Sequence, residues 1–149
     1  MNKYFLIGAM AFAFVGCKTS NNVANDSSIQ TQLRGSWTLT KVDYSKDYKV
    51  TSFHVADAKC FEGSKWDLVA NNNRGVVSLN TNRDCPEFTS NITWNIKKDG
   101  TFNFKFIGSE KAKHVNEGYS LDVTNVSTNS FTLVDRSTEA KISYTFVKN

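Results

Sequence analysis

Strict alternation of apolar and polar residues governs this chain from Leu33 onward. In the run Phe102-Asn103-Phe104-Lys105-Phe106, every second residue is apolar. Because successive side chains of a β-strand point to opposite faces, each such run gives one apolar and one polar face. The same alternation recurs in seven runs, which are residues 37–39, 66–70, 92–96, 102–106, 119–123, 131–133 and 142–146. The pattern therefore predicts a β-structure with no long helix.

Turn-forming residues separate these runs. Asn71 to Gly75, Lys98-Asp99-Gly100 and Ser127-Thr128-Asn129 all contain residue types that tolerate the positive φ of tight hairpins. Sequential strands joined in this way are antiparallel, so we expect one all-β domain of eight or nine strands, a barrel or a sandwich. Only residues 56–64 are expected to hold a helical turn.

The amino terminus predicts export. Lys3 is followed by an apolar run from Tyr4 to Val15, which is too short to cross a bilayer but has the layout of a signal peptide. Phe14-Val15-Gly16-Cys17 resembles the lipobox of bacterial lipoproteins, and that resemblance implies cleavage after residue 16 and fatty acylation of Cys17. We expect a signal peptide over residues 1–16 and a membrane-anchored protein of the bacterial cell envelope, with the outer membrane favoured.

Residues 17–32 are polar and aperiodic, and we expect them to form a flexible, lipidated tether before a folded part that begins at Leu33. The formal net charge of +4 falls by one when Lys3 is removed with the signal peptide. The remaining basic residues are scattered among acidic ones. Because nucleic-acid binding needs clustered positive charge, we expect no nucleic-acid partner.

Two cysteines remain once Cys17 is assigned to the lipid. Cys60 and Cys85 are an even pair in a compartment where disulfides persist, so we expect a bond between them. A metal site is the alternative, but His54 is the one candidate ligand nearby and no ligand motif surrounds it. We expect neither a metal nor a cofactor.

The opening Leu33-Arg34-Gly35-Ser36-Trp37 resembles the Gly-x-Trp motif of lipocalins. Further segments are similar to the lipocalin-like lipoproteins common in Bacteroidota, namely Cys60 to Trp66, Asn71 to Gly75, Cys85, Ile92-Thr93-Trp94 and Gly118-Tyr119. The resemblance covers residues 33–149 and implies an antiparallel, up-and-down, eight-stranded barrel with Trp37 at its closed end. Arg136 is the candidate for the arginine that covers this tryptophan in lipocalins.

No catalytic constellation is visible in the sequence. His54 and His114 have no nucleophile at triad spacing, and carboxylates such as Asp43, Asp57 and Asp67 fall in turns or on polar strand faces. We therefore expect that the protein is not an enzyme.

The inward face of the expected barrel is rich in aromatic residues. The positions expected to line it are Trp37, Leu39, Trp66, Trp94, Phe102, Phe104, Phe106, Tyr119, Tyr144 and Phe146. An eight-stranded barrel is just wide enough to be filled by its own side chains or to hold one small ligand. The sequence leaves both outcomes open.

Two binding functions follow from these outcomes. A hollow barrel would bind or carry a small apolar ligand, with Lys41, Tyr44 or Tyr119 as polar contacts at its mouth. A solid barrel would serve as a scaffold whose loops, such as residues 44–48 or 71–74, contact an envelope protein as an interaction or inhibitor module. An enzyme acting on envelope material is a third hypothesis without a visible catalytic group.

Overall fold

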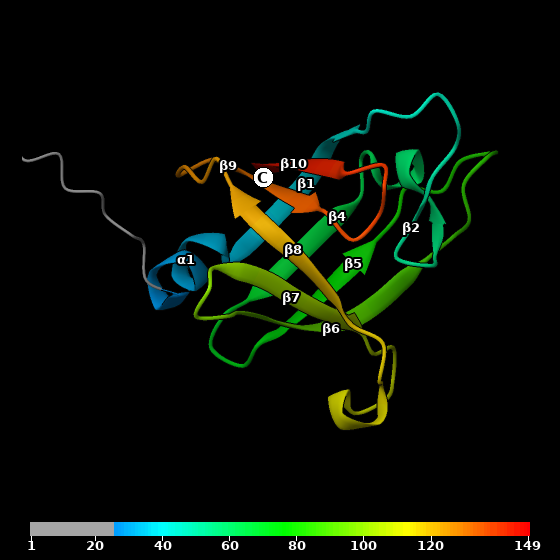
Figure 1. Ribbon diagram of the computed structural model, residues 1–149. Helices are drawn as coiled ribbons and strands as arrows, with labels where there is room; N and C mark the ends of the chain where they lie inside the picture. The colour runs from blue at the N-terminus through cyan, green and yellow to red at the C-terminus, as the bar shows by residue number, and fades with distance from the viewer. Residues whose placement is uncertain (1–25) are drawn as a thin grey trace, which may run out of the picture.

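Eight antiparallel strands close into a barrel in the computed structural model, which describes residues 26–149 (Figure 1). The barrel strands are β1 (Gly35–Asp43), β4 (Lys65–Val69), β5 (Arg74–Ser78), β6 (Thr89–Ile96), β7 (Thr101–Phe106), β8 (Tyr119–Thr124), β9 (Ser130–Asp135) and β10 (Ile142–Lys148). Consecutive barrel strands are neighbours, and β1 pairs with both β4 and β10 to close the ring. The predicted up-and-down, eight-stranded barrel is confirmed.

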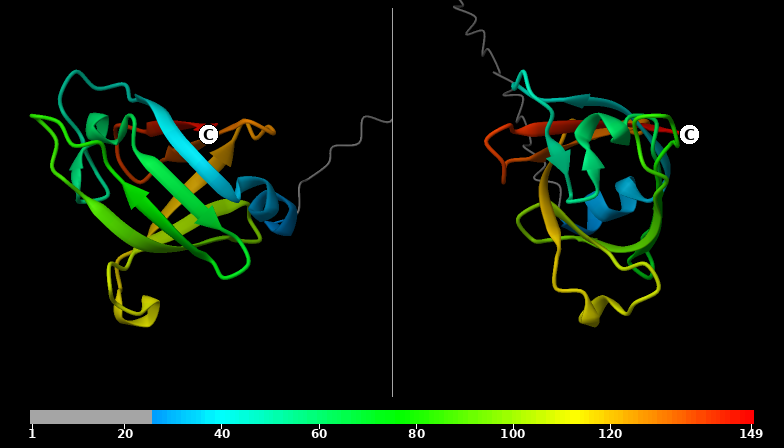
Figure 2. Two further views of the ribbon diagram at one scale, coloured as in Figure 1. Left: turned by 180° about the vertical axis from the view of Figure 1, so that it is seen from behind. Right: turned by 90° about the vertical axis from the view of Figure 1, so that its right-hand side faces the viewer.

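The two ends of the barrel differ in what covers them. Short turns join β4 to β5, β6 to β7 and β8 to β9 at one end, where helix α1 (Asp26–Leu33) also lies. The opposite end carries the longer connections, including a small hairpin of β2 (Thr51–Ser52) and β3 (Ala56–Asp57). The right-hand view of Figure 2 shows this hairpin across the near end and α1 at the far end. We call the end with the β2–β3 hairpin the open end and the end with α1 the closed end.

Strand β5 is the one barrel strand that the alternation did not mark. Its residues Gly75, Val76 and Val77 give no apolar–polar alternation, although Val77 is fully buried and Val76 is exposed. Gly75 takes the inward position without a side chain because a Cβ there would lie 2.3 Å from the carbonyl oxygen of Asp67. The close packing of β4 against β5 therefore requires glycine at a position where the alternation would have an apolar side chain.

The folded part begins earlier than the sequence predicts. The expected tether over residues 17–32 was to end at Leu33, but Asp26–Leu33 form α1 and this helix is attached to the barrel. The Gln30 side chain donates to the Asn73 side chain at 2.7 Å and accepts from the backbone N–H of Ile96 at 3.2 Å. Leu33 is fully buried. Only two helical turns pack here, so the helix leaves no long periodic signal. The signal peptide, Cys17 and residues 18–25 lie outside the described residues.

The predicted helical turn and the predicted disulfide are both confirmed. Helix η1 (Ala58–Phe61) lies within residues 56–64, and a second short helix, η2 (Ala112–His114), lies between β7 and β8. Cys60 in η1 is bonded to Cys85 in the β5–β6 connection. The bond thus ties together two connections of the open end. Over residues 26–149, no helix has both the length and the apolar character needed to cross a membrane.

Candidate functional site

The lumen of the barrel is the candidate site, because the ten predicted lining residues gather there. Eight of them expose no more than 2% of their surface, and these are Trp37, Leu39, Trp66, Trp94, Phe102, Phe104, Tyr144 and Phe146. Phe106 and Tyr119 are half-buried and pack against the same cluster. The alternation therefore placed these side chains correctly, while contact with a ligand remains a prediction for all ten.

The closed half of the lumen is built around Trp37. Its indole N–H donates to the carbonyl oxygen of Leu33 at 2.8 Å, which joins β1 to the end of α1. Phe131 meets the indole edge-on at a centroid distance of 4.7 Å and stacks on Phe146 at 4.6 Å. Each ring is fully buried, and the one buried polar group of this set is hydrogen-bonded, so this half is a permanently packed core.

The covering residue of Trp37 differs from the prediction. The Lys148 ammonium lies 5.0 Å from the centre of the indole, within the range of a cation–π contact. Arg136, the sequence-based candidate, instead pairs with Asp122 on the surface, so that prediction is wrong. The strand register explains the difference, because β10 places Lys148 directly opposite Trp37, whereas Arg136 follows the open-end terminus of β9.

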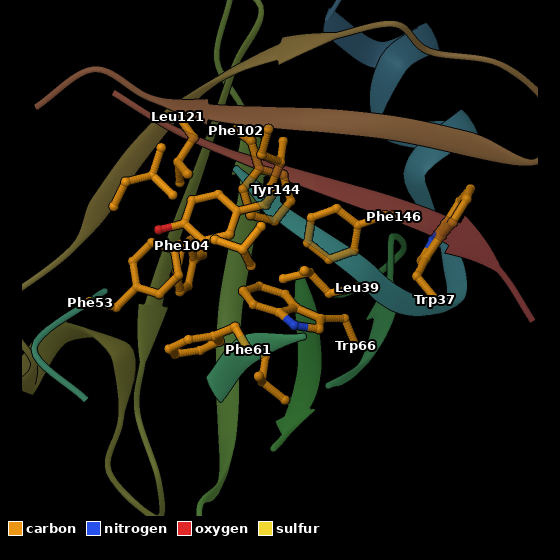
Figure 3. Close-up of a cluster of buried hydrophobic side chains, with 14 of the residues drawn as sticks. Trp37, Leu39, Phe53, Phe61, Trp66, Phe102, Phe104, Leu121, Tyr144 and Phe146 are labelled. Atoms are coloured by element: carbon orange, nitrogen blue, oxygen red, sulfur yellow. The ribbon is translucent and has the colours of Figure 1, made fainter. Parts of the chain in front are cut away.

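The open half of the lumen is centred on Phe53, which comes from the β2–β3 hairpin and not from a barrel strand. Its ring lies 5.1 Å from the rings of both Phe104 and Tyr119 and stacks on Tyr144 at 5.2 Å. Figure 3 shows Phe53 at one end of the aromatic cluster and Trp37 at the other. Phe53 and His54 both have φ of 52°, a conformation that is uncommon outside glycine. The hairpin therefore bends sharply to insert this ring.

Two tyrosine hydroxyls hold the hairpin in place. The Tyr144 hydroxyl shares a hydrogen bond of 2.6 Å with the Ser52 hydroxyl, and the Tyr119 hydroxyl donates to the Phe53 carbonyl oxygen at 2.7 Å. Burial raises the pKa of Tyr144 despite the opposing Ser52 hydrogen bond. Burial, reinforced by the negative charge of Glu117, raises the pKa of Tyr119 to about 12. Both phenols are thus neutral at physiological pH and are available as hydrogen-bond donors.

Side chains fill the centre of the lumen. Four hollows of about 420 to 490 Å³ occur on the described part of the chain. None of these four is lined by Phe53, Trp66 or Tyr144. The Phe53 ring lies 5.1 Å from the ring of Phe104 and 5.2 Å from that of Tyr144, so a ligand in the centre of the lumen would have to displace a side chain that occupies it here.

The other residues singled out in the sequence lie outside the lumen or at its rim. Lys41 pairs with Asp43 at 3.1 Å, and both side chains are exposed. The half-buried Tyr44 has the Lys59 ammonium 5.6 Å from its ring centre. Of the three residues predicted to contact a ligand at the mouth of the barrel, Tyr119 is the one that is hydrogen-bonded to the β2–β3 hairpin.

The histidines lie on the surface. His54 pairs with Glu117, and His114 lies 3.8 Å from Glu110. Within residues 26–149, no group of three or more His, Cys, Asp or Glu side chains is arranged to hold a metal ion.

Sequence reasoning missed three aromatic residues that complete the lumen. Phe131 had the correct alternation but was not included among the lining residues. Phe61 comes from η1, and Phe53 comes from the tight hairpin turn. Neither of these two belongs to an alternating run, so only the chain path across the open end brings them inside.

Two comparisons with known proteins found similarities to this chain. A family described as a lipocalin-like domain matches residues 33–134. The chain is also similar to the solved structure of bovine odorant-binding protein in complex with a selenium-containing odorant, with 12% sequence identity and a TM-score of 0.47. That similarity covers 80% of this chain and 72% of the bovine protein. Among curated proteins, none matches the sequence.

Proposed function

This chain belongs to the family of lipocalin-like domains, and on that premise we propose that it binds a small apolar molecule in the open half of its barrel. The ligand takes the place of the Phe53 ring. The observation that carries this proposal is the origin of Phe53, which enters the lumen from the turn of the β2–β3 hairpin and not from a barrel strand. A hairpin can swing outward without breaking any ladder of the closed barrel.

The surroundings of Phe53 determine the chemistry of the ligand. Departure of the ring leaves a space walled by Phe61, Trp66, Phe104 and Tyr144. Apolar and aromatic walls of this kind favour an apolar ligand, because water in such a space has few hydrogen-bonding partners. The hydroxyl of Tyr144, which loses its Ser52 partner when the hairpin moves, supplies one polar contact that orients the ligand.

Tryptophan fluorescence tests the proposal, because Trp66 lies 6.5 Å from Phe53 between ring centres. A panel of fatty acids, retinoids and haem-like compounds is titrated into the wild-type protein and into Phe53→Ala. We expect saturable quenching by at least one compound, with tighter binding by Phe53→Ala because no ring then competes with the ligand for the space. Phe131→Ala is the matched control, since it removes an equal ring from the closed half and leaves the open half unchanged. The absence of any saturable response from both the wild type and Phe53→Ala would refute the proposal.

A protein-interaction role is the second candidate, and the exposed Tyr48 favours it. This side chain is 59% exposed, in the connection between β1 and β2. Tyrosine is enriched at protein interfaces, where one end of the ring is apolar and the other is wet. Under this alternative the lumen responds to no ligand, while Tyr48→Ala weakens capture of an envelope protein.

We also propose that the protein acts at the membrane of the cell envelope. Acylation of Cys17 would hold the barrel at the envelope membrane, since multiple acyl chains anchor stably where a single chain binds only reversibly. The lipobox-like Phe14-Val15-Gly16-Cys17 supports this assignment. Fractionation of cells that express Cys17→Ala should find the protein in the soluble fraction. Unchanged membrane retention would contradict acylation without affecting the proposal for the lumen.

A further inference from the structure

A groove with both polar and apolar lining lies over strands β6 and β7, and Trp94, Phe104 and Tyr119 of the lumen set also contribute to its lining. It has a volume of about 460 Å³ and runs along the outward side chains of β6 and β7. Its wall is the segment of residues 116–120, which leads from the β7–β8 connection into β8. Figure 1 shows this connection, with η2, standing away from the barrel. The outer face of a barrel is convex, so the protruding connection is what creates a concave site here.

The wall is held to the strand by Lys105. The Lys105 ammonium donates to the carbonyl oxygen of Val115 at 2.9 Å. Gly118 lies so close to the same side chain that an added Cβ would be 3.3 Å from the Lys105 Cγ. The groove is therefore a built feature of the fold, with one wall tied to its floor.

The floor of the groove carries an unusual pair of residues. Asn95 and Asn103 lie directly opposite each other on β6 and β7. Asparagine is depleted in strands, where threonine or valine fits the pleated surface better. The Asn103 amide N–H₂ is held by the backbone oxygen and the hydroxyl of Thr101, both at 3.1 Å, whereas Asn95 has no side-chain hydrogen bond within residues 26–149. The hydrogen bonds to Thr101 account for Asn103, whereas no side-chain contact within residues 26–149 accounts for Asn95, and its amide is available to a ligand.

Thr93 and Tyr119 of the groove already donate hydrogen bonds, to the carbonyl oxygens of Asn73 and Phe53. The side chains of Asn116 and Ser120 form no hydrogen bond in the described part of the chain. The charge of Lys97 adds to the Thr101 hydrogen bonds that lower the pKa of Asp99, a carboxyl that does not line the groove. No carboxylate lines the groove, while Lys97 and Lys105 both do. The lining therefore carries two lysines and no carboxylate, and the side chains of Asn95, Asn116 and Ser120 have no hydrogen bond within residues 26–149.

From this chemistry we propose that the groove binds an oligosaccharide that carries carboxylate groups. An amide side chain offers a donor and an acceptor in one plane, which matches the neighbouring hydroxyls of a sugar ring. The Lys97 ammonium pairs with the carboxylate of the sugar. The site does not depend on the lumen, and it leaves the open end of the barrel free for the apolar ligand.

Nuclear magnetic resonance titration of the ¹⁵N-labelled full-length protein tests this proposal. A short oligogalacturonate is the probe, and a neutral maltooligosaccharide of equal length is the control ligand. We expect saturable shifts of backbone signals in residues 93–105 and 116–120 with oligogalacturonate, and at least about tenfold weaker effects with the neutral sugar.

Two variants connect the shifts to the named side chains. Asn95→Thr with Asn103→Thr should weaken binding by at least about tenfold while leaving the melting temperature equal or higher, because threonine is the better strand residue. Lys97→Gln should weaken binding and reduce its dependence on salt, and Lys141→Gln, which changes an exposed lysine outside the groove, should do neither. The proposal is overturned if no saturable shifts occur, if both groove variants bind as the wild type does, or if the shifts fall on the Trp66 indole. Equal binding of the neutral sugar would overturn the assignment of a carboxylate-bearing ligand.

Discussion

The closed half and the open half of this barrel are both packed with aromatic rings, but different parts of the chain supply them. Trp37, Phe131 and Phe146 of the closed half all come from barrel strands. In the open half, Phe53 and Phe61 come from connections that cross the end of the barrel. A barrel strand is hydrogen-bonded to a neighbour on each side, whereas the β2–β3 hairpin belongs to a separate two-stranded sheet and can move without breaking those barrel ladders. Aromatic rings that are similarly buried in the two halves can therefore differ in how easily they leave the lumen.

Truncation of one phenylalanine in each half tests this difference most directly. Phe131→Ala should lower the free energy of unfolding by about 3–5 kcal/mol, because the strands around it cannot collapse into the cavity. Phe53→Ala should cost about 2 kcal/mol or less, because the hairpin can relax once its ring is gone. Urea denaturation of both variants measures the two losses. Equal losses would show that Phe53 is as permanent a part of the core as Phe131.

The disulfide limits how far the open half can loosen. Cys60 and Cys85 are separated by 25 residues along the chain, so replacing both with alanine should cost about 3 kcal/mol through the freedom gained by the unfolded chain. Amide hydrogen exchange of the variant should accelerate first in the open-end connections and last around Trp37. Uniform acceleration across the barrel would contradict the distinction between the halves.

The buried hydroxyl pair that holds the hairpin should make a smaller contribution. Ser52→Ala and Tyr144→Phe each break the hydrogen bond of 2.6 Å, and each leaves one polar group buried without its partner. A double-mutant cycle should give a coupling energy of about 1 kcal/mol. Additive effects in this cycle would mean that the bond does not hold the hairpin.

Alkaline pH offers the mildest perturbation of the open half. Burial raises the pKa of Tyr119 from 10.0 to about 12, so the folded state favours the neutral phenol. Its contribution to stability is fully present below about pH 10 and is lost as the pH rises toward 12. Urea midpoints measured across this range should fall with pH, and Tyr119→Phe should make the fall shallower. Tyr48→Phe is the control, because Tyr48 is exposed and should leave the slope unchanged.

The sequence predicted most of the barrel and part of the site. Alternating runs such as Ile92-Thr93-Trp94 assigned strands and inward faces correctly, because burial of one face of a sheet imposes a period of two on the residues themselves. The resemblance to lipocalins, carried in part by Gly35 and Trp37, implied that Trp37 lies at the closed end, where the structure has it bonded to the end of α1. The prediction failed at Arg136, because the residue that covers Trp37 is chosen by the pairing of β1 with β10 and not by any local pattern.

Alternation along the chain was enough to assign seven of the eight barrel strands, the inward aromatic residues on those strands and the all-β class, and the resemblance to lipocalins added the barrel. The tertiary structure alone decided that α1 attaches to the closed end, that Phe53 fills the open half, and that Asn95 and Asn103 meet beside the segment 116–120. The difference arises from how far apart along the chain the interacting residues are. Strand patterning depends on neighbours two residues apart, whereas each of these features joins segments that are adjacent only after the barrel has closed.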